Sequence, residues 1–464
     1  MRSTVLSFLL FSLLIGALGS ASQPAASPSP VIFTAARQFN SEAWIRGGER
    51  FPLGANLWIR DSKGQRPLIP AFAASTDANI SFDGTHILFA GKRLTADRWQ
   101  IWEAPINGGQ PRQLTNCKDE CVRPFYLPDS RIAFAERKAG AFVIETATID
   151  ASRPQADKTH SPSSAPNKPP TPLTFLSGSA LPTDVLRDGR TLFEAVYPLG
   201  AGAKAELYTV YTDGSGVESY RCDHGDDRHS AKQTGSGDIV FVSANNLARF
   251  TSPLAHADPI PAPKGQFAGD VLQLPSGDWL MPWRNSSAEP FRLMQWKPGT
   301  SSLEPFARQG DLNLLQPVLV ASRPVPNRHP SGLHDRPNAN LLCLNAYTSK
   351  YSFDSGSIAT VKLYARTASG QPKLLGSSPV ESDGSFFLHV PSDQPIKLEL
   401  LDASGKTLKK EAGWFWMRRG EQRICVGCHA GPERAPENEV PKVLLKSTDP
   451  VDLTLETHTR TGGR

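Results

Sequence analysis

Short apolar runs, each entered through a tight turn, recur along the chain between residues 31 and 320. The residues after the turns are β-branched or aromatic, as in Ile87-Leu88-Phe89, and such residues favour strands. Asp-Gly and Ser-Gly pairs favour tight turns because glycine accepts a positive φ without a Cβ clash. The pattern therefore predicts a series of β-hairpins, with turns at Gly84, Ser130, Gly189, Gly237 and Gly277.

The spacing of these turns indicates the architecture. The intervals are 46, 59, 48 and 40 residues, and a period of ~40–50 residues with four short strands is typical of a propeller blade. The long interval contains residues 151–172, which are rich in Ser, Pro and Lys and which we interpret as a disordered surface loop. An earlier unit near Asn56–Ile59 raises the expected number of blades to about six. We predict an all-β fold with an N-terminal propeller over residues 31–320, and an array of β-sandwiches is the alternative.

A second β module is expected after a Pro-, Arg- and His-rich linker at residues 321–339. Residues 340–413 contain alternating stretches such as Lys397-Leu398-Glu399-Leu400, which favour an antiparallel sheet with one solvated face. The sequence predicts a small β-sandwich there, with strands at Leu341–Ala346, Thr360–Tyr364, Phe386–Val390 and Ile396–Leu401.

The N-terminus has the features of a secretory signal. Arg2 precedes an apolar run at Val5–Leu18, and small residues follow up to Ala21. We predict a signal peptide at residues 1–21 and a Pro/Ser-rich linker at 22–30; a membrane anchor is the alternative, although a spanning helix needs ~20 apolar residues. The mature chain, with no membrane span, is therefore expected to be exported, to the periplasm or the extracellular space.

Composition excludes some classes of protein. Among 464 residues, 50 Lys+Arg against 45 Asp+Glu give a net charge of +5, too small an excess to indicate a nucleic-acid partner. The 40 prolines disfavour a helical bundle, because each internal proline removes a helix hydrogen bond. Six cysteines are too few for a disulfide scaffold. Their positions are therefore more informative than their number.

The segment Cys425-Val426-Gly427-Cys428-His429 is a Cys-x-x-Cys-His motif, the signature of covalent haem c attachment. Two thiols three positions apart can form thioethers with the two vinyl groups of one porphyrin, and the next imidazole then ligates the iron. A redox disulfide, a zinc site and an inert disulfide are alternatives, but a βαβ context and a second Cys/His pair are not evident. We predict one haem c, with Cys425 and Cys428 as thioether anchors, Gly427 allowing close passage of the macrocycle, and His429 as the axial ligand of the iron.

The surroundings of the motif leave several readings open. The apolar run Trp414–Met417 could line a haem pocket or pack in an ordinary core, and an open sixth position would permit substrate chemistry. The loop at 222–229 could instead bind a metal or simply be polar, and no mechanism follows for the segment 431–438. The candidate distal ligands of the iron are Met417, His224, His229 and His458, the last in a tail at 443–464 that is expected to be flexible.

The remaining cysteines are assigned by position. Cys117 and Cys121 flank a three-residue loop, and an exported protein favours a disulfide between them. Cys222 and Cys343 either pair with each other or remain buried thiols.

Two resemblances join these pieces. Residues 82–115 resemble TolB-type propeller repeats. The stretch 375–386, followed by Val390-Pro391 and Gly420-Glu421 and leading into the Cys425–His429 motif, resembles the middle domain and first haem site of the hydrazine synthase alpha-subunit family. That resemblance implies a propeller, a β module and a haem c segment at 414–442. The family carries further C-terminal sequence with a second haem, which this sequence lacks, so hydrazine synthesis itself is not expected.

These features lead to two functional hypotheses. The first is an exported monohaem c-type cytochrome that transfers electrons, or acts as a haem-dependent oxidoreductase at the propeller–haem junction, with a redox partner protein or a small-molecule substrate that the sequence does not identify. The second is a non-catalytic TolB-like binding module with a Cys425–Cys428 disulfide. A hydrolase is a weaker third reading, because no nucleophile motif is present.

Overall fold

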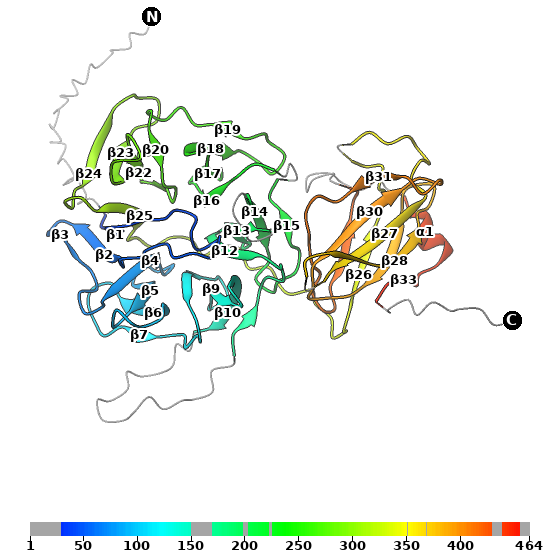
Figure 1. The fold of residues 1–464 in the computed structure, drawn as a ribbon, viewed down its shortest axis with the longest axis horizontal. Coiled ribbons are helices and arrows are strands. Elements are labelled where there is room, and N and C mark those ends of the chain that lie inside the picture. The colour runs from blue at the N-terminus through cyan, green and yellow to red at the C-terminus, as the bar shows by residue number, and fades with distance from the viewer. Residues whose placement is uncertain are drawn as a thin grey trace, which may run out of the picture.

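The computed structural model describes residues 29–149, 169–197, 203–221, 225–349, 351–367, 369–428 and 439–454. Figure 1 shows two β units side by side, a larger one built from residues 31–319 and a smaller one built from residues 339–452. The helix in the described residues, α1 (Lys442–Lys446), is short. The all-β prediction is therefore confirmed.

The larger unit is a propeller of six antiparallel sheets, which we number as blades in chain order. Each blade is given with its innermost strand first. Blade one is β25 (Asn313–Leu319), β1 (Val31–Ala36), β2 (Asn56–Asp61) and β3 (Gly64–Pro67); blade two is β4 (Ala74–Ile80), β5 (His86–Lys92), β6 (Gln100–Pro105) and β7 (Arg112–Gln113); blade three is β8 (Cys121–Tyr126), β9 (Arg131–Lys138), β10 (Ala141–Thr148) and β11 (Thr171–Pro172).

The second half of the propeller repeats this plan. Blade four is β12 (Ser179–Val185), β13 (Thr191–Val196), β14 (Ala205–Val210) and β15 (Glu218–Ser219); blade five is β16 (His229–Gln233), β17 (Ile239–Ser243), β18 (Asn246–Phe250) and β19 (Asp258–Pro259); blade six is β20 (Gln266–Phe267) and β21 (Leu272–Gln273), then β22 (Trp279–Arg284), β23 (Arg292–Trp296) and β24 (Leu303–Ala307). The inner position of blade six is thus divided between two short strands that both pair with β22.

The two ends of the propeller segment meet in blade one. β1 pairs with β2 on one side and with β25 on the other, where Val31 lies opposite Leu319. The ring is therefore closed by strands that are almost 300 residues apart in sequence, which removes two open sheet edges. The five predicted turns lie between the first and second strands of blades two to six, and all five central residues have positive φ, Gly84 at 78° and Ser130 at 64° among them.

The linker at 321–339 is attached to the propeller. The Arg323 amide donates to the Phe82 carbonyl at 2.8 Å, and the Asn327 amide donates to the Arg187 carbonyl at 2.9 Å. The turn glycines allow this contact, since a Cβ on Gly84 would lie 2.8 Å from the Ser322 amide nitrogen. The linker therefore crosses the face of the propeller on which these turns lie.

The smaller unit is the predicted β-sandwich. One sheet has the order β32 (Gln422–Cys425), β26 (Ala339–Cys343), β29 (Phe386–Val390) and β33 (Val451–Asp452); the other has the order β28 (Pro372–Pro379), β27 (Thr360–Arg366), β30 (Ile396–Leu401) and β31 (Thr407–Lys410). Apolar side chains from both sheets, such as Leu363 and Leu388, are fully buried between them. The four predicted strands are present, and β28, β31, β32 and β33 were not foreseen.

Two expectations about loops were wrong in part. The tail from residue 443 was expected to be flexible, but α1 and β33 lie within it, β33 pairs with β29, and Leu453 is buried in the sandwich core. The disordered insertion was expected to reach residue 172, but Thr171–Pro172 form the outer strand of blade three. Residues 151–168 and the predicted signal peptide lie outside the described residues. Within the part of the chain that is described, no helix is long and apolar enough to cross a membrane.

Candidate haem-attachment site

The first motif cysteine ends an edge strand of the sandwich. β32 runs parallel to β26, and the register places Cys425 opposite Cys343. The Leu344 amide donates to the Cys425 carbonyl at 2.9 Å, which continues the ladder past the strand end. Pairing with β26 therefore positions the motif at the edge of this sheet.

Gly427 packs against the loop that follows β26. A Cβ on Gly427 would lie 2.0 Å from the Thr348 carbonyl oxygen and 2.8 Å from the Asn345 carbonyl oxygen. The glycine was expected to allow close passage of the macrocycle. The structure gives it a second role, because only glycine lets the chain turn against this loop and carry Cys428 back toward the sandwich core.

Substitution of Gly427 tests this packing. We expect Gly427→Ala to destabilise the sandwich by about 1–3 kcal/mol, because the added methyl overlaps a backbone oxygen and the loop must move. Thermal unfolding of the haem-free chain measures the loss. Gly332→Ala is the matched control, since a Cβ on Gly332 meets nothing within 4 Å. Equal unfolding temperatures for the two variants would contradict the packing role.

Three thiols gather at this end of the sandwich. Cys343, Cys425 and Cys428 are not disulfide-bonded in the structure, and all three contact the same apolar core. Burial raises the pKa of Cys425 to about 11. A hydrogen bond with Cys428, followed by burial, raises the pKa of Cys343 well above its ordinary value. The Cys343 and Cys425 thiols are therefore protonated at neutral pH in this haem-free form.

Glu421 fastens the motif strand to blade four. Its carboxylate accepts hydrogen bonds from the Gly216 amide at 3.2 Å and the Arg418 amide at 2.7 Å, and it pairs with Arg423 at 2.7 Å. The Arg423 guanidinium also donates to the Val217 carbonyl at 3.4 Å. The edge strand is thus held between the sandwich and the turn that connects β14 to β15.

The residues present fit a covalently attached porphyrin. Cys425 and Cys428 are not cross-linked to each other and have the spacing that two thioethers require. Ile424, beside the first thiol, is 63% exposed, and an exposed apolar side chain at a sheet edge suits contact with an apolar macrocycle. His429 lies outside the described residues, so its role as axial ligand stays a prediction.

The apolar run before the motif divides between two cores. Trp416 is fully buried in the propeller, where it contacts Phe175 and Phe193, and its indole donates to the Gly214 carbonyl at 2.9 Å. Met417 is fully buried in the sandwich core that the three thiols contact. Of the two readings of this run, the structure favours packing, with Trp416 joining the domains.

The candidate distal ligands are placed only in part. His229 begins β16, is buried, and lies 3.1 Å from the Ser230 hydroxyl through its Nδ1 atom. His224, His458 and Cys222 lie outside the described residues, so the roles predicted for them stay predictions. Cys343 is a buried thiol beside Cys428. Among described residues, no group of three or more His, Cys, Asp or Glu side chains is arranged to hold a metal ion.

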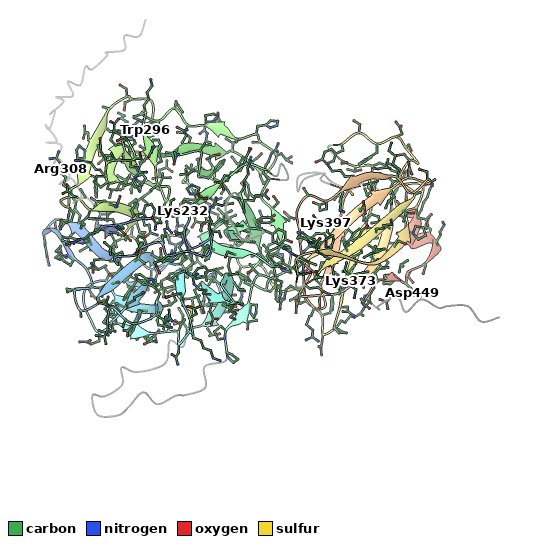
Figure 2. The ribbon with its side chains drawn as sticks, viewed as in Figure 1. Lys232, Trp296, Arg308, Lys373, Lys397 and Asp449 are labelled. Carbon is green, nitrogen blue, oxygen red and sulfur yellow. A yellow bond between two sulfur atoms is a disulfide. The ribbon has the colours of Figure 1, made fainter. Side chains whose placement is uncertain are left out.

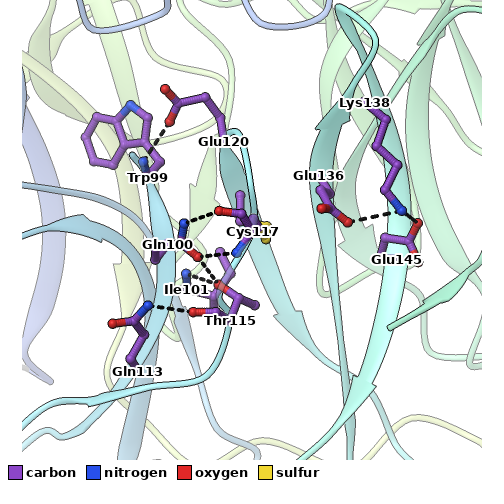
Figure 3. The surroundings of a disulfide bond; sticks show 11 residues. Trp99, Gln100, Ile101, Gln113, Thr115, Cys117, Glu120, Glu136, Lys138 and Glu145 are labelled. Atoms are coloured by element: carbon purple, nitrogen blue, oxygen red, sulfur yellow. Dashed lines mark hydrogen bonds and ion pairs between the residues drawn. A yellow bond between two sulfur atoms is a disulfide. The ribbon is translucent and has the colours of Figure 1, made fainter. Parts of the chain in front are cut away.

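A disulfide joins Cys117 and Cys121 at the entrance to blade three. Figure 3 shows how the bridged loop is held: the Gln100 side chain donates to the Cys117 carbonyl at 3.1 Å and accepts from its amide at 2.9 Å. Glu120, within the loop, accepts from the Trp99 amide at 2.7 Å. The bridge therefore joins this loop to the start of β8, and Gln100 holds the loop against β6.

Sequence reasoning missed a buried ionic cluster on the propeller axis. Arg123 lies 3.2 Å from Asp270, Arg50 lies 3.5 Å from it and Lys232 lies 3.8 Å from it; Figure 2 shows Lys232 near the middle of the propeller. Burial opposes ionisation of Asp270, but the three cations outweigh it and hold its pKa at about 2. The adjoining cavity has a volume of about 30 Å³, too small for an organic substrate.

The strands that build this cluster share an unusual backbone. The inner strands or inner edges of five blades each place one non-glycine residue at positive φ, namely Asp77 at 56°, Arg123 at 55°, Ser230 at 54°, Asp270 at 51° and Gln316 at 52°. Such bulges turn a side chain out of the regular alternation. An inference from the alternation of apolar and polar residues along each strand would therefore not place these side chains on the propeller axis.

A larger cavity lies between the linker and blades three and four. Its volume is about 360 Å³, and Asp129, Arg131, Asp213 and His329 contribute to its lining. His329 stacks on Tyr211 with ring centroids 3.9 Å apart. Asp213 begins the same turn, 213–217, that holds Trp416 and Glu421, so this cavity adjoins the contact between propeller and sandwich.

Comparison with known proteins agrees with this architecture. A model of the hydrazine synthase alpha subunit middle domain matches residues 347–430, which include the Cys-x-x-Cys-His motif. Hydrazine synthase subunit alpha of Kuenenia stuttgartiensis is 38% identical over 68 residues, which are 15% of this chain and 8% of that subunit.

Structural similarity extends further than sequence similarity. The solved structure of Kuenenia stuttgartiensis hydrazine synthase aligns with a TM-score of 0.73 at 18% identity, covering 90% of this chain and 72% of that one. TolB from Acinetobacter baumannii aligns with 62% of this chain and 66% of its own, with a TM-score of 0.41 and 11% identity. The family model matches the segment that carries the motif, whereas the match in fold includes the propeller: residues 347–430 are similar to the hydrazine synthase alpha middle domain, and the chain as a whole has a fold similar to that of hydrazine synthase.

Proposed function

We propose that this chain is an exported c-type cytochrome-like protein that carries one covalent haem at Cys425, Cys428 and His429. The observation that carries the proposal is the match to the hydrazine synthase alpha middle domain, which runs through residue 430 and so includes the whole attachment motif. The two motif cysteines at the edge of the sandwich sheet support it. The Cys117–Cys121 disulfide supports export, because such bonds persist in oxidising compartments.

In this proposal the chain's own residues hold and orient the group. Cys425 and Cys428 anchor the porphyrin edge, His429 ligates the iron, and the Glu421 contacts with blade four fix the strand that presents them. The bound haem would supply one-electron redox chemistry. A motif strand that is held in this way suits electron transfer with a partner protein, because the haem would gain and lose electrons with little movement of the chain.

A small-molecule substrate has one suitable place. The cavity of about 360 Å³ beside the linker has the volume of a ligand site, and the turn 213–217 connects its wall to the motif strand. Charged side chains line it, which suits a small polar substrate. We place any redox catalysis, as distinct from simple electron transfer, at this junction of propeller and haem segment.

Covalent haem is the direct test. The mature chain, produced together with haem c attachment machinery, is expected to show a Soret band that survives acid–acetone extraction. The double variant Cys425→Ala/Cys428→Ala should lose this band almost completely, because the thioether bonds are gone. Cys117→Ala/Cys121→Ala is the control and should retain the haem. Absence of extraction-resistant haem in the wild-type chain would refute the proposal.

The same sample distinguishes electron transfer from substrate chemistry. If the sixth position of the iron is open, carbon monoxide shifts the Soret band of the reduced protein; if a side chain occupies it, the shift is absent. The second candidate function, a TolB-like binding module with a Cys425–Cys428 disulfide, predicts neither haem nor free thiols at these positions. The match to the middle domain favours the first candidate, because it runs through the whole Cys-x-x-Cys-His motif.

A further inference from the structure

The third thiol at the haem site needs an explanation. Cys343 is not part of the attachment motif, yet β26 carries it into register with Cys425, on the neighbouring strand. Its side chain is 2% exposed, and its sulfur is in hydrogen-bond contact with that of Cys428. Cys425 and Cys428 pack against the apolar core that contains Cys343, so all three sulfurs adjoin one core.

This arrangement suits a disulfide more than an accidental contact. A disulfide needs two sulfurs that face each other, and the side-chain hydrogen bond between Cys343 and Cys428 brings these two sulfurs together. Cys428 returns toward β26 because Gly427 turns against the Thr348 carbonyl. The chain already contains one disulfide, Cys117–Cys121, as expected where thiols are oxidised during folding.

We propose that, in the haem-free protein, Cys343 forms a disulfide with Cys428 and thereby keeps one of the two attachment thiols from reacting. Cys425 is then the thiol that remains reduced. The cross-link would join the motif to the centre of the sandwich sheet, so that the segment is ordered before the haem arrives. The effect of the disulfide on haem attachment rests on the proposed function. Formation of the disulfide itself does not.

The oxidation balances with a disulfide donor of low molecular weight, such as oxidised glutathione. The Cys428 thiolate attacks the donor, which gives a mixed disulfide and one released thiol. The Cys343 thiolate then attacks the Cys428 sulfur and expels the second thiol. The donor takes up two electrons, and the two cysteines lose two protons in all. Reversal by an external dithiol restores both thiols, and Cys428 can then form its thioether.

Thiol mapping of the wild-type chain tests the inference without haem. The full mature chain is exported to an oxidising compartment in cells that lack haem c attachment, alkylated on denaturation and digested without reduction. Trypsin releases Cys343 on a peptide separate from that of Cys425 and Cys428, so a cross-linked pair is recognised by mass, and fragmentation identifies the cysteine involved. A Cys343–Cys428 link supports the inference. A Cys425–Cys428 link, a Cys343–Cys425 link or a free Cys343 overturns it.

A variant gives an independent readout. In Cys343→Ala, alkylation of Cys428 in the folded chain is expected to rise by about tenfold, since the competing disulfide has been removed. Leu341→Ala is the matched control, because Leu341 lies on the same strand, is also 2% exposed and has no sulfur. A similar rise in the control would mean that core damage, not loss of a disulfide, exposes Cys428, and would overturn the inference.

The failure of this inference can be separated from the failure of the proposed function. With attachment machinery present and no added dithiol, Cys343→Ala should incorporate more haem than the wild type. If both incorporate haem equally, the disulfide does not limit attachment and this inference fails, while the haem function stands. If neither incorporates haem even with added dithiol, the proposed function fails. Thiol mapping of the haem-free chain still shows whether the Cys343–Cys428 disulfide forms.

Discussion

Replacing Asp270 by asparagine is expected to destabilise the propeller by about 3–5 kcal/mol, because it breaks a buried set of ion pairs and leaves cations without their counter-charge. Asp270 is the shared partner of Arg123, Arg50 and Lys232. The Arg123 side chain is only 3% exposed, so water cannot replace the lost carboxylate. Urea unfolding of the mature chain, followed by tryptophan fluorescence, measures the change.

Asp258→Asn is the matched control for this effect. Asp258 pairs with Arg249 at 3.0 Å on the outer strand of blade five, but its side chain is 52% exposed. An exposed pair of this kind contributes about 0–1 kcal/mol. If Asp270→Asn proves no more destabilising than Asp258→Asn, the axial cluster does not hold the blades together.

The same pair of variants has a pH signature. The folded-state pKa of Asp270 is about 2, below its ordinary value of 3.8. A carboxyl group whose pKa is depressed by folding adds stability above the ordinary pKa and loses it as the pH falls toward the folded value. The stability difference between the wild type and Asp270→Asn should therefore be constant from pH 7 to 5 and shrink between pH 4 and 2.

Sequence predicted the propeller because its signals are local. The Asp-Gly pair at Gly84 and the Ser-Gly pair at Gly277 indicate tight turns. The central residues of all five predicted turns have the positive φ that glycine tolerates. The period of the turns then gives the blades. Closure of the ring was not predictable from the same signals, since the pairing of Val31 with Leu319 depends on the whole ring being assembled.

The site was predictable only as a motif. Cys425, Cys428 and His429 follow from spacing, but the approach of Cys343 depends on parallel pairing between β26 and β32, which are separated by most of the sandwich. The axial cluster has the same cause, since Arg123 and Asp270 are 147 residues apart. The tail was misjudged because α1 and β33 are short and have no buried residues. Its one buried anchor, Leu453, depends on the pairing with β29.

The contact between the two domains leads to the second large effect. Trp416→Ala is expected to weaken docking of the sandwich on blade four by about 3–5 kcal/mol, the usual cost of truncating a fully buried aromatic side chain. Trp416 comes from the segment next to the sandwich, yet it is fully buried in the propeller core against Phe175 and Phe193. Its loss removes apolar contact and leaves the Gly214 carbonyl without its indole donor.

Small-angle X-ray scattering of the mature chain measures the consequence. The wild type should give a single distribution of interatomic distances for two docked domains, and Trp416→Ala should give a broader one with a larger maximum dimension. Trp416→Phe should remain docked, because it keeps most of the apolar contact and loses one hydrogen bond worth about 1 kcal/mol. This graded series separates packing from hydrogen bonding at the contact.

Trp296→Ala is the control for general damage to the propeller. Trp296 is 1% exposed and packs within blade six against Trp279, so its truncation should lower propeller stability without changing the scattering profile of the folded protein. A broadened profile for Trp296→Ala, or an unchanged one for Trp416→Ala, would contradict the assignment of Trp416 as the residue that joins the domains. Because the same segment leads into Cys425, undocking should also free the motif strand from Glu421 and its contacts with blade four. In the haem-loaded protein, Trp416→Ala should therefore expose the haem to external reductants and speed its reduction, whereas Trp296→Ala should leave that rate unchanged.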